Sequence, residues 1–176
     1  PEFYVANNKK ELKEAAIKLN YGQVPVVIKP CIGNGSRGIR VLDGTADRFD
    51  LLFNQKPSSI FSTLEEVMTS IGGKEIPKIV VSEYLPGAEL TIDTIVKNGD
   101  LLDCLIRTRT SINSGISTSG NFVENKEVYE YVNKIVSVIP GLSGPIGFQV
   151  KKSAKGKYLL LESNPRIQGT SVAAIG

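Results

Sequence analysis

The sequence predicts an α+β fold, in which helices are combined with mainly antiparallel strands. Two pairs of strand-like segments are each separated by a short turn, which makes the members of each pair antiparallel neighbours. The first turn holds Asn98-Gly99, the strongest short hairpin signal, and the second holds Lys155-Gly156. The four segments are residues 89–97, 100 to about 112, 145–152 and 157–164.

Helices are predicted where apolar residues recur with helical spacing. In residues 8–19 one face carries Leu12, Ala15, Ala16 and Leu19, and Asn8 is available as the cap. Residues 126–139 show the same periodicity between the two hairpins. The pattern from 45 to 70 is weaker: Phe49, Leu52 and Phe53 suggest a helix, and Thr63-x-x-Glu66 has the spacing of a capping box. Further strands are expected at 24–29, 39–43 and 78–84, and a polar loop at 113–121.

Composition restricts the chemistry. The chain has 176 residues, a formal net charge of +3 and no histidine, which excludes Ser-His and Cys-His catalysis and histidine metal sites. The small net charge argues against nucleic acid as a partner. Neither a membrane-spanning run nor a signal peptide is visible. The two cysteines, Cys31 and Cys104, have no metal-binding spacing, so we expect a reduced, cytoplasmic protein.

A glycine motif, Gly33-x-Gly35-Ser36-x-Gly38, follows the strand that contains Lys29. A dinucleotide-binding turn would open a helix, but residues 39–43 are strand-like, so we expect a hairpin loop instead. Its backbone amides could fold over phosphate groups. An ordinary Gly-rich hairpin is the alternative, and a lysine at the end of a strand means little alone.

The last hairpin carries a cluster of oxygen ligands. In a two-residue loop Ala154 pairs with Lys157, which places Gln149 opposite Glu162, and Asn164 follows on the same face by alternation. The other face then holds an apolar set: Ile146, Phe148, Val150, Leu159 and Leu161. One carboxylate and two amide oxygens suit Mg²⁺, and Arg166 could reach the same phosphates. The alternative is a solvated polar face on a surface hairpin.

The stretch SEYLPGAELTID, residues 82–93, is a second candidate site. The bend around Pro86-Gly87 leaves backbone groups that could contact an adenine edge, and Glu89 could accept from ribose hydroxyls. A Pro-Gly turn followed by a solvated glutamate is the alternative. In the register set by Asn98-Gly99, Arg107 and Arg109 lie on the opposite side of the sheet from Glu89.

Together these segments resemble the ATP-grasp superfamily, and most closely the ATP-binding domain of carbamoyl-phosphate synthase large chains. The matching text is PVVIKPCIGNGSRGI, VVSEYLPGAELTIDTI, GPIGFQV and LLLESNPRIQGTS, in that order. The resemblance implies one ATP-grasp domain over 1–176, with two lobes that grip ATP. The smaller lid lobe would cover about 20–84 and the larger lobe, with the metal site, about 85–176.

The resemblance also implies roles for individual residues. Lys29 would contact the α-phosphate, and the glycine loop, with Gly33, Gly35, Ser36 and Gly38, would close over the phosphates. Backbone groups of Glu83 and Leu85, with Tyr84 between them, would contact adenine. Glu89 would hold the ribose and Arg166 would face the transferred phosphoryl group. The ligands of Mg²⁺, or of Mn²⁺ in its place, would be Gln149, Glu162 and Asn164.

The function that the resemblance implies is an ATP-dependent ligase. Family members phosphorylate a carboxylate or bicarbonate with ATP, and an amine or ammonia then attacks the acyl phosphate. Typical members begin with another small α/β domain, so we expect an upstream domain of the same protein as a partner, and a homodimer is also compatible. The alternatives are a nucleotide-binding or regulatory module without catalysis, and a different substrate, such as an amino acid.

Overall fold

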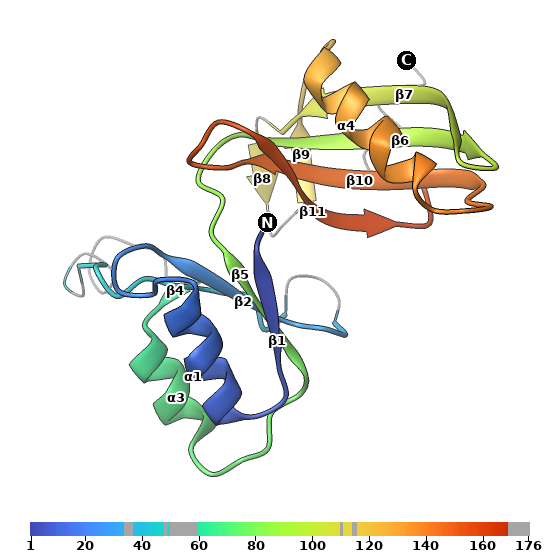
Figure 1. The fold of residues 1–176 in the computed structure, drawn as a ribbon. Helices are drawn as coiled ribbons and strands as arrows, with labels where there is room; N and C mark the ends of the chain where they lie inside the picture. The colour runs from blue at the N-terminus through green and yellow to red at the C-terminus, as the bar shows by residue number, and fades with distance from the viewer. Residues whose placement is uncertain (34–36, 48, 50–59, 110, 114–115, 169–176) are drawn as a thin grey trace. The chain divides into compact units, whose positions relative to one another are not determined.

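The computed structural model of the chain describes residues 1–33, 37–47, 49, 60–109, 111–113 and 116–168 (Figure 1). The chain divides into two compact units, Pro1–Tyr84 and Leu85–Gly176. Each unit combines helices with a sheet, and among the pairs of named strands only β3–β4 is parallel. The predicted α+β fold with mainly antiparallel strands is therefore confirmed.

The first unit is a five-stranded sheet covered by two helices in the described residues. The strand order is β1-β5-β2-β3-β4, and helices α1 and α3 supply apolar side chains to its core. The bounds are β1 Phe3–Ala6, α1 Lys9–Lys18, β2 Val26–Pro30, β3 Arg40–Leu42, β4 Phe61–Ser62, α3 Leu64–Ile71 and β5 Ile79–Glu83.

Both predicted helix starts in this unit are confirmed. The Asn8 side chain accepts from the backbone N–H of Glu11 at 2.9 Å, which caps α1. Thr63 and Glu66 form the predicted capping box at α3. All four apolar residues predicted for the inner face of α1 are buried. The helix suggested by Phe49, Leu52 and Phe53 lies largely outside the described residues, which include only Phe49 of these three.

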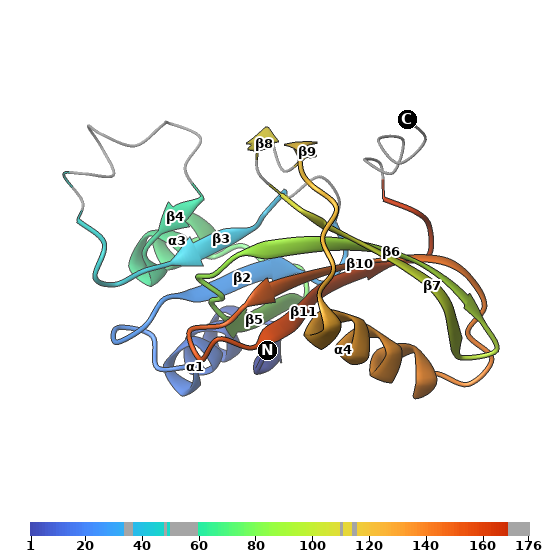
Figure 2. The same ribbon diagram turned by 90° about the horizontal axis from the view of Figure 1, so that it is seen from above.

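The second unit is a four-stranded antiparallel sheet in the order β11-β10-β6-β7, with helix α4 along one face (Figure 2). The bounds are β6 Glu89–Lys97, β7 Asp100–Thr108, α4 Lys126–Ser137, β10 Gly144–Lys152 and β11 Tyr158–Asn164. Val128, Val132 and Val136 recur along α4 and are fully buried against the sheet. This face of the sheet is the core, so the opposite face is the one that can carry polar chemistry.

Two elements of the second unit differ from the prediction. The segment predicted as a loop at 113–121 contains a strand, β9 Ile116–Ser119, paired with β8 Ser111–Asn113. The preceding strand, predicted to reach about residue 112, is interrupted after Thr108. Serine and threonine are compatible with both turns and strands, which is why composition alone was misleading here.

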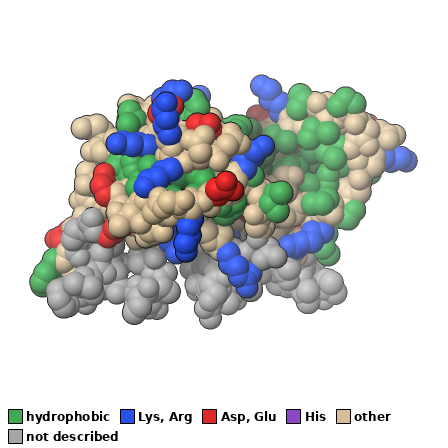
Figure 3. Space-filling view, turned by 90° about the horizontal axis from the view of Figure 1, so that it is seen from below, with side chains coloured by type: hydrophobic (Ala, Val, Ile, Leu, Met, Phe, Trp, Pro, Cys, Tyr) green, Lys and Arg blue, Asp and Glu red, His purple; other side chains and the backbone are tan. Residues whose placement is uncertain are grey.

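One face of the described residues carries charges of both signs. On the face shown in Figure 3, Lys and Arg side chains are interspersed with acidic and apolar ones. In the described residues, no helix combines the length and the apolar character needed to cross a bilayer.

Candidate functional site

The polar face of the four-stranded sheet brings residues from all four strands into one row. Cross-strand pairing joins Arg107 to Thr91, Thr91 to Gln149, and Gln149 to Glu162. The neighbouring row joins Asp93 to Gly147 and Gly147 to Asn164. Side chains alternate along a strand, so on each strand the residue that lies between these two rows points to the core on the other side of the sheet. The sheet thus collects the predicted metal ligands on one surface.

The pair Gln149–Glu162 forms as predicted, although the hairpin that produces it is different. The turn is longer than two residues: Ser153 N–H donates to the Lys157 carbonyl at 2.8 Å, and Lys152 pairs with Tyr158. The register then shifts between Gln149 and Val150, with Leu161 as the extra residue of a β-bulge. The prediction of a two-residue Lys155-Gly156 loop is therefore wrong, but its error is cancelled by the bulge.

The bulge also changes which leucines face the core. Val150 pairs with Leu160, and the core includes Leu160 and Tyr158 as partly buried members. The predicted core positions Leu159 and Leu161 are therefore wrong, because the longer turn moves this half of the strand by one residue and reverses its faces. On β10 the prediction is confirmed, since Ile146, Phe148 and Val150 are all buried.

The three predicted metal ligands, Gln149, Glu162 and Asn164, lie next to one another. Glu162 and Gln149 are cross-strand neighbours, and the Asn164 amide donates to Glu162 Oε1 at 2.9 Å. Among the described residues no three His, Cys, Asp or Glu side chains are grouped as a metal site. A cation on this face would therefore depend on the Glu162 carboxylate together with amide oxygens. Oxygen ligands of this kind fit Mg²⁺, which keeps other positions for water or phosphate.

Arg109 connects two of the predicted site residues. Its guanidinium forms an ion pair with Glu89, and the same nitrogen donates to Gln149 Oε1 at 3.3 Å. The side chains of Arg109 and Glu89 are only 7% and 16% exposed. The prediction that Arg107 and Arg109 lie on the opposite side from Glu89 is wrong. A β-bulge at Leu102 of β7, opposite the step from Ile95 to Val96, shifts the hairpin register by one residue and brings both arginines to the polar face.

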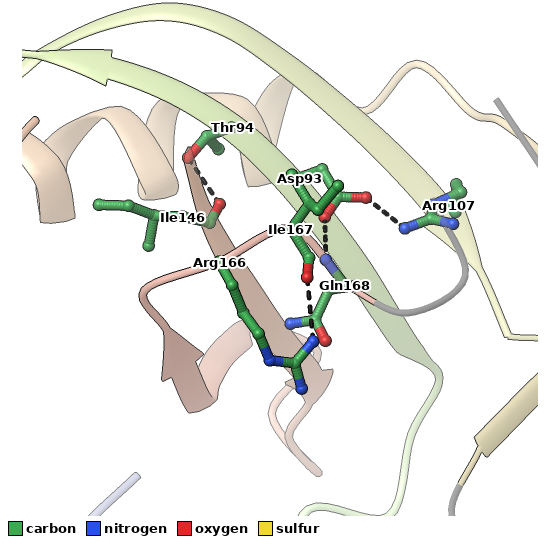
Figure 4. A network of polar contacts seen from close by, with 7 residues as sticks. All are labelled: Asp93, Thr94, Arg107, Ile146, Arg166, Ile167 and Gln168. Atoms are coloured by element: carbon green, nitrogen blue, oxygen red, sulfur yellow. Dashed lines mark hydrogen bonds and ion pairs between the residues drawn. The ribbon is translucent and has the colours of Figure 1, made fainter. Parts of the chain in front are cut away.

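A second buried network on this face was not predicted. Asp93 forms an ion pair with Arg107 and also accepts from the backbone N–H of Gln168 at 2.7 Å (Figure 4). Gln168 lies shortly after Arg166, so this contact holds the segment that carries Arg166, the residue predicted to face the transferred phosphoryl group. The signal in the sequence was the alternation of Glu89, Thr91 and Asp93, which puts three polar residues on one side of the strand with Leu90 and Ile92 between them.

In the first unit, the glycine segment joins two antiparallel strands, as predicted. Ile28 pairs with Arg40, so a strand and not a helix follows the glycines. Gly38 has φ +78°, and a Cβ there would lie 2.8 Å from Pro30 Cγ, so this position requires glycine. Lys29 is half-buried on β2 opposite Val80. Gly33 is described, whereas Gly35 and Ser36 lie outside the described residues.

The bend after β5 has fewer available backbone groups than predicted. The Glu83 N–H donates to the Glu2 carbonyl at 3.0 Å, and the Gly87 N–H donates to the Lys152 carbonyl at 2.9 Å. The Ala88 carbonyl accepts from the Lys152 N–H at 2.9 Å. These three groups are used by the fold. Tyr84 is the last residue of the first unit, and Leu85, only 3% exposed, is the first residue of the second.

Comparison with protein families identifies the chain. A family model described as ATP-grasp in the biosynthetic pathway with Ter operon matches residues 75–175, more than half of the chain. The chain belongs to this ATP-grasp family. No curated protein matches the ATP-grasp chain in sequence.

Solved structures share the ATP-grasp fold with this chain. One is PurK, an N5-carboxyaminoimidazole ribonucleotide synthetase in complex with ADP, with 17% identity and a TM-score of 0.64 over 97% of this chain. Another is phosphoribosylamine–glycine ligase from Thermotoga maritima, with 21% identity and a TM-score of 0.63 over 97%. The ligase PsnB, in complex with a minimal precursor, Mg and ADP, has 15% identity and a TM-score of 0.58 over 99%. The chain spans 41%, 44% and 47% of these three chains.

Proposed function

We propose that this ATP-grasp chain is the nucleotide- and metal-binding part of an ATP- and Mg²⁺-dependent ligase that activates a carboxylate for attack by an amine. The observation that carries the proposal is the pairing of Gln149 with Glu162, together with the hydrogen bond from Asn164 to Glu162. Family membership and the ADP complexes of PurK and PsnB support ATP as the nucleotide. A bicarbonate substrate, as in carbamoyl-phosphate synthase, is the narrower form of the proposal.

The proposed metal site consists of Gln149, Glu162 and Asn164. A Mg²⁺ ion held there would neutralise negative charge on the phosphates of ATP. Arg109 contributes a further positive charge beside Gln149, and its pairing with Glu89 balances that charge. Glu89 remains the proposed ribose acceptor, so nucleotide binding would require it to share or exchange its arginine partner.

The first unit supplies the proposed phosphate contacts. The hairpin between β2 and β3 carries the glycine loop, and Lys29 lies on β2 shortly before it. Backbone N–H groups in a glycine loop bind phosphate oxygens without steric obstruction from side chains. For adenine, the proposed contacts are the Glu83 carbonyl and Leu85. The Glu83 N–H is not proposed, because it donates to the Glu2 carbonyl.

The proposed chemistry needs no nucleophile from the protein. The γ-phosphoryl group passes from ATP to a carboxylate oxygen and ADP leaves; an amine then attacks the acyl carbon and expels phosphate. Phosphoryl transfer of this kind depends on positioning and on neutralising charge. Arg166, just beyond Asn164, is the proposed guanidinium at the transferred phosphoryl group, where its planar fork suits phosphate.

Hydroxylamine trapping tests catalysis against the alternative of a non-catalytic module. Full-length protein is incubated with Mg·ATP, hydroxylamine and a panel of carboxylates that includes bicarbonate and amino acids. A ligase forms an acyl phosphate, which hydroxylamine converts to a hydroxamate, or a carboxyphosphate from bicarbonate, which it converts to an N-hydroxycarbamate, while ADP accumulates. A nucleotide-binding module retains Mg·ATP affinity but gives no hydroxamate and no carboxylate-dependent ADP with any member of the panel. The Glu162→Gln variant is the matched control, because it keeps the shape of the side chain and removes its charge.

A further inference from the structure

The segment that follows β11, residues 165–168, is fixed to the polar face of the sheet (Figure 4). At its start, the Arg166 N–H donates to the Asn164 carbonyl at 2.8 Å. The Arg166 guanidinium donates to the Ile167 carbonyl at 2.9 Å. At its end, the Gln168 N–H donates to Asp93 Oδ1 at 2.7 Å, across 75 positions of sequence. The segment that carries Arg166 is thus tied to the sheet at both ends.

Asp93 uses its two carboxylate oxygens for two different partners. Oδ1 accepts from the Gln168 backbone, and Oδ2 accepts from the Arg107 guanidinium. The exposed fractions of Asp93, Arg107 and Gln168 are 8%, 5% and 7%, so all three are buried. A carboxylate away from water needs a counter-charge and hydrogen bonds, and Arg107 supplies the charge. The hydrogen bond to Gln168 is then charge-assisted, which makes it stronger than a neutral one.

Gly147 provides the space for this arrangement. It pairs with Asp93 on one side and Asn164 on the other, so it lies between the network and the proposed metal site. A Cβ at Gly147 would lie 2.5 Å from Gln168 Nε2 and 2.9 Å from its Cγ and Cδ. Its backbone φ is not positive, so a side chain at 147 would be opposed by the close approach of Gln168 and not by backbone conformation. The Gln168 side chain occupies the position that a side chain at 147 would fill.

From these contacts we propose that Asp93, Arg107 and Gly147 position Arg166 for the terminal phosphate of ATP. Asp93 anchors the end of the segment, Arg107 holds the Asp93 carboxylate, and Gly147 leaves room for Gln168. We assign none of the three a contact with the nucleotide, so their proposed role is to position Arg166. The inference rests on the proposed function, since it assigns Arg166 to a phosphate group of bound ATP.

The test compares nucleotide affinities in the full-length protein by titration calorimetry in Mg²⁺. The measured quantity is the ratio of the affinities for a non-hydrolysable ATP analogue and for AMP. A guanidinium at the terminal phosphate raises only the first affinity, so Arg166→Ala should lower the ratio by about tenfold or more. Gly147→Ala should lower it similarly by displacing Gln168, and should have little further effect in the Arg166→Ala background.

Two further variants provide a second test and a control. Asp93→Asn keeps an oxygen that can accept from Gln168 but removes the charge that Arg107 balances. This variant replaces Gly147→Ala in the test if Gly147→Ala does not fold. Thr94→Val is the matched control: Thr94 follows Asp93 on β6 but faces the core, where its hydroxyl donates to the Ile146 carbonyl at 2.8 Å. This control should lower thermal stability and leave the affinity ratio unchanged.

Amide hydrogen exchange separates the inference from the proposed function. The Gln168 amide should be protected in the wild-type protein, and its exchange should accelerate at least tenfold in Gly147→Ala and Asp93→Asn. If the wild-type protein does not bind the ATP analogue, the proposed function fails, and the assignment of Arg166 fails with it. If the wild-type protein binds the analogue and the variants keep the wild-type ratio of affinities, the positioning role is wrong although the proposed function stands. The same conclusion follows if the effects of Gly147→Ala and Arg166→Ala on this ratio are additive.

Discussion

Gln149 lies directly opposite Glu162 because two irregularities of one hairpin compensate each other. The turn at 153–157 sets Lys152 opposite Tyr158, and the bulge at Leu161 moves the register by one residue before Glu162 is reached. A regular strand presents residues two positions apart on the same face. The bulge lets Leu160 face the core while Glu162 faces the polar side. The candidate metal site therefore depends on a local departure from regular β-structure.

The ion pair between Arg109 and Glu89 should be strongly coupled. Because both side chains are largely buried, removing either charge leaves the other without this partner, at a cost of roughly 3–5 kcal/mol in the free energy of unfolding. We expect Arg109→Gln and Glu89→Gln to be destabilising in chemical denaturation, and the double variant to cost clearly less than their sum. Strictly additive costs would show that the two side chains do not interact.

Gly38→Ala should destabilise the protein through the backbone of the glycine hairpin. The residue has φ +78°, and a new Cβ would meet Pro30 Cγ at 2.8 Å, so a loss of about 1–3 kcal/mol is expected in thermal unfolding. Gly73→Ala is the control, since a Cβ at Gly73 meets nothing within 4 Å and its φ is not positive. Equal effects of the two substitutions would contradict the described hairpin geometry.

The two cysteines should differ in reactivity. Cys31 is exposed, whereas burial, with a smaller contribution from the charge of Asp103, raises the pKa of the Cys104 thiol to about 11. Only the thiolate is alkylated, so at pH 8 iodoacetamide should modify Cys31 well before Cys104, and unfolding in urea should remove the difference. Mass spectrometry of the alkylated peptides measures both rates. Comparable rates in the folded protein would contradict this burial.

The same pKa shift predicts a loss of stability at alkaline pH. The unfolded thiol ionises near pH 9 and the folded one near pH 11, so protons are retained longer in the folded state. The contribution of Cys104 is fully present below pH 9 and is lost as the pH rises to about 11. Cys104→Ala should therefore show a shallower decline in stability over that interval, measured by urea denaturation. A decline as steep as that of the wild-type protein would contradict the shift.

Much of the fold could be predicted because local signals and tertiary packing agree. Asn8 and Thr63 cap the helices that their spacing indicated, and Asn98 and Gly99 both adopt the positive φ of the hairpin turn expected there. The register beyond each turn could not be predicted, because the bulges at Leu102 and Leu161 have no distinctive sequence signal. They decide which face Arg109 and Leu160 occupy.

The network around Asp93 was inaccessible to sequence reasoning for a different reason. The contact between Asp93 and Gln168 joins residues 75 positions apart, and no local pattern couples them. Gly147 likewise has an ordinary backbone conformation, so only the position of Gln168 explains why it is glycine. Close approach between distant segments becomes visible only when the sheet has been assembled.

The proposed nucleotide-dependent metal site on the polar face can be tested by titration calorimetry of a non-hydrolysable ATP analogue into the full-length protein. The titration is made with and without Mg²⁺, for the wild-type protein and for Glu162→Gln. We predict affinity that increases with Mg²⁺ in the wild-type protein and loses this dependence in the variant, whose circular dichroism and thermal stability stay close to wild type. Identical Mg²⁺ dependence in the two proteins would contradict the assignment of Glu162 as the metal-binding carboxylate.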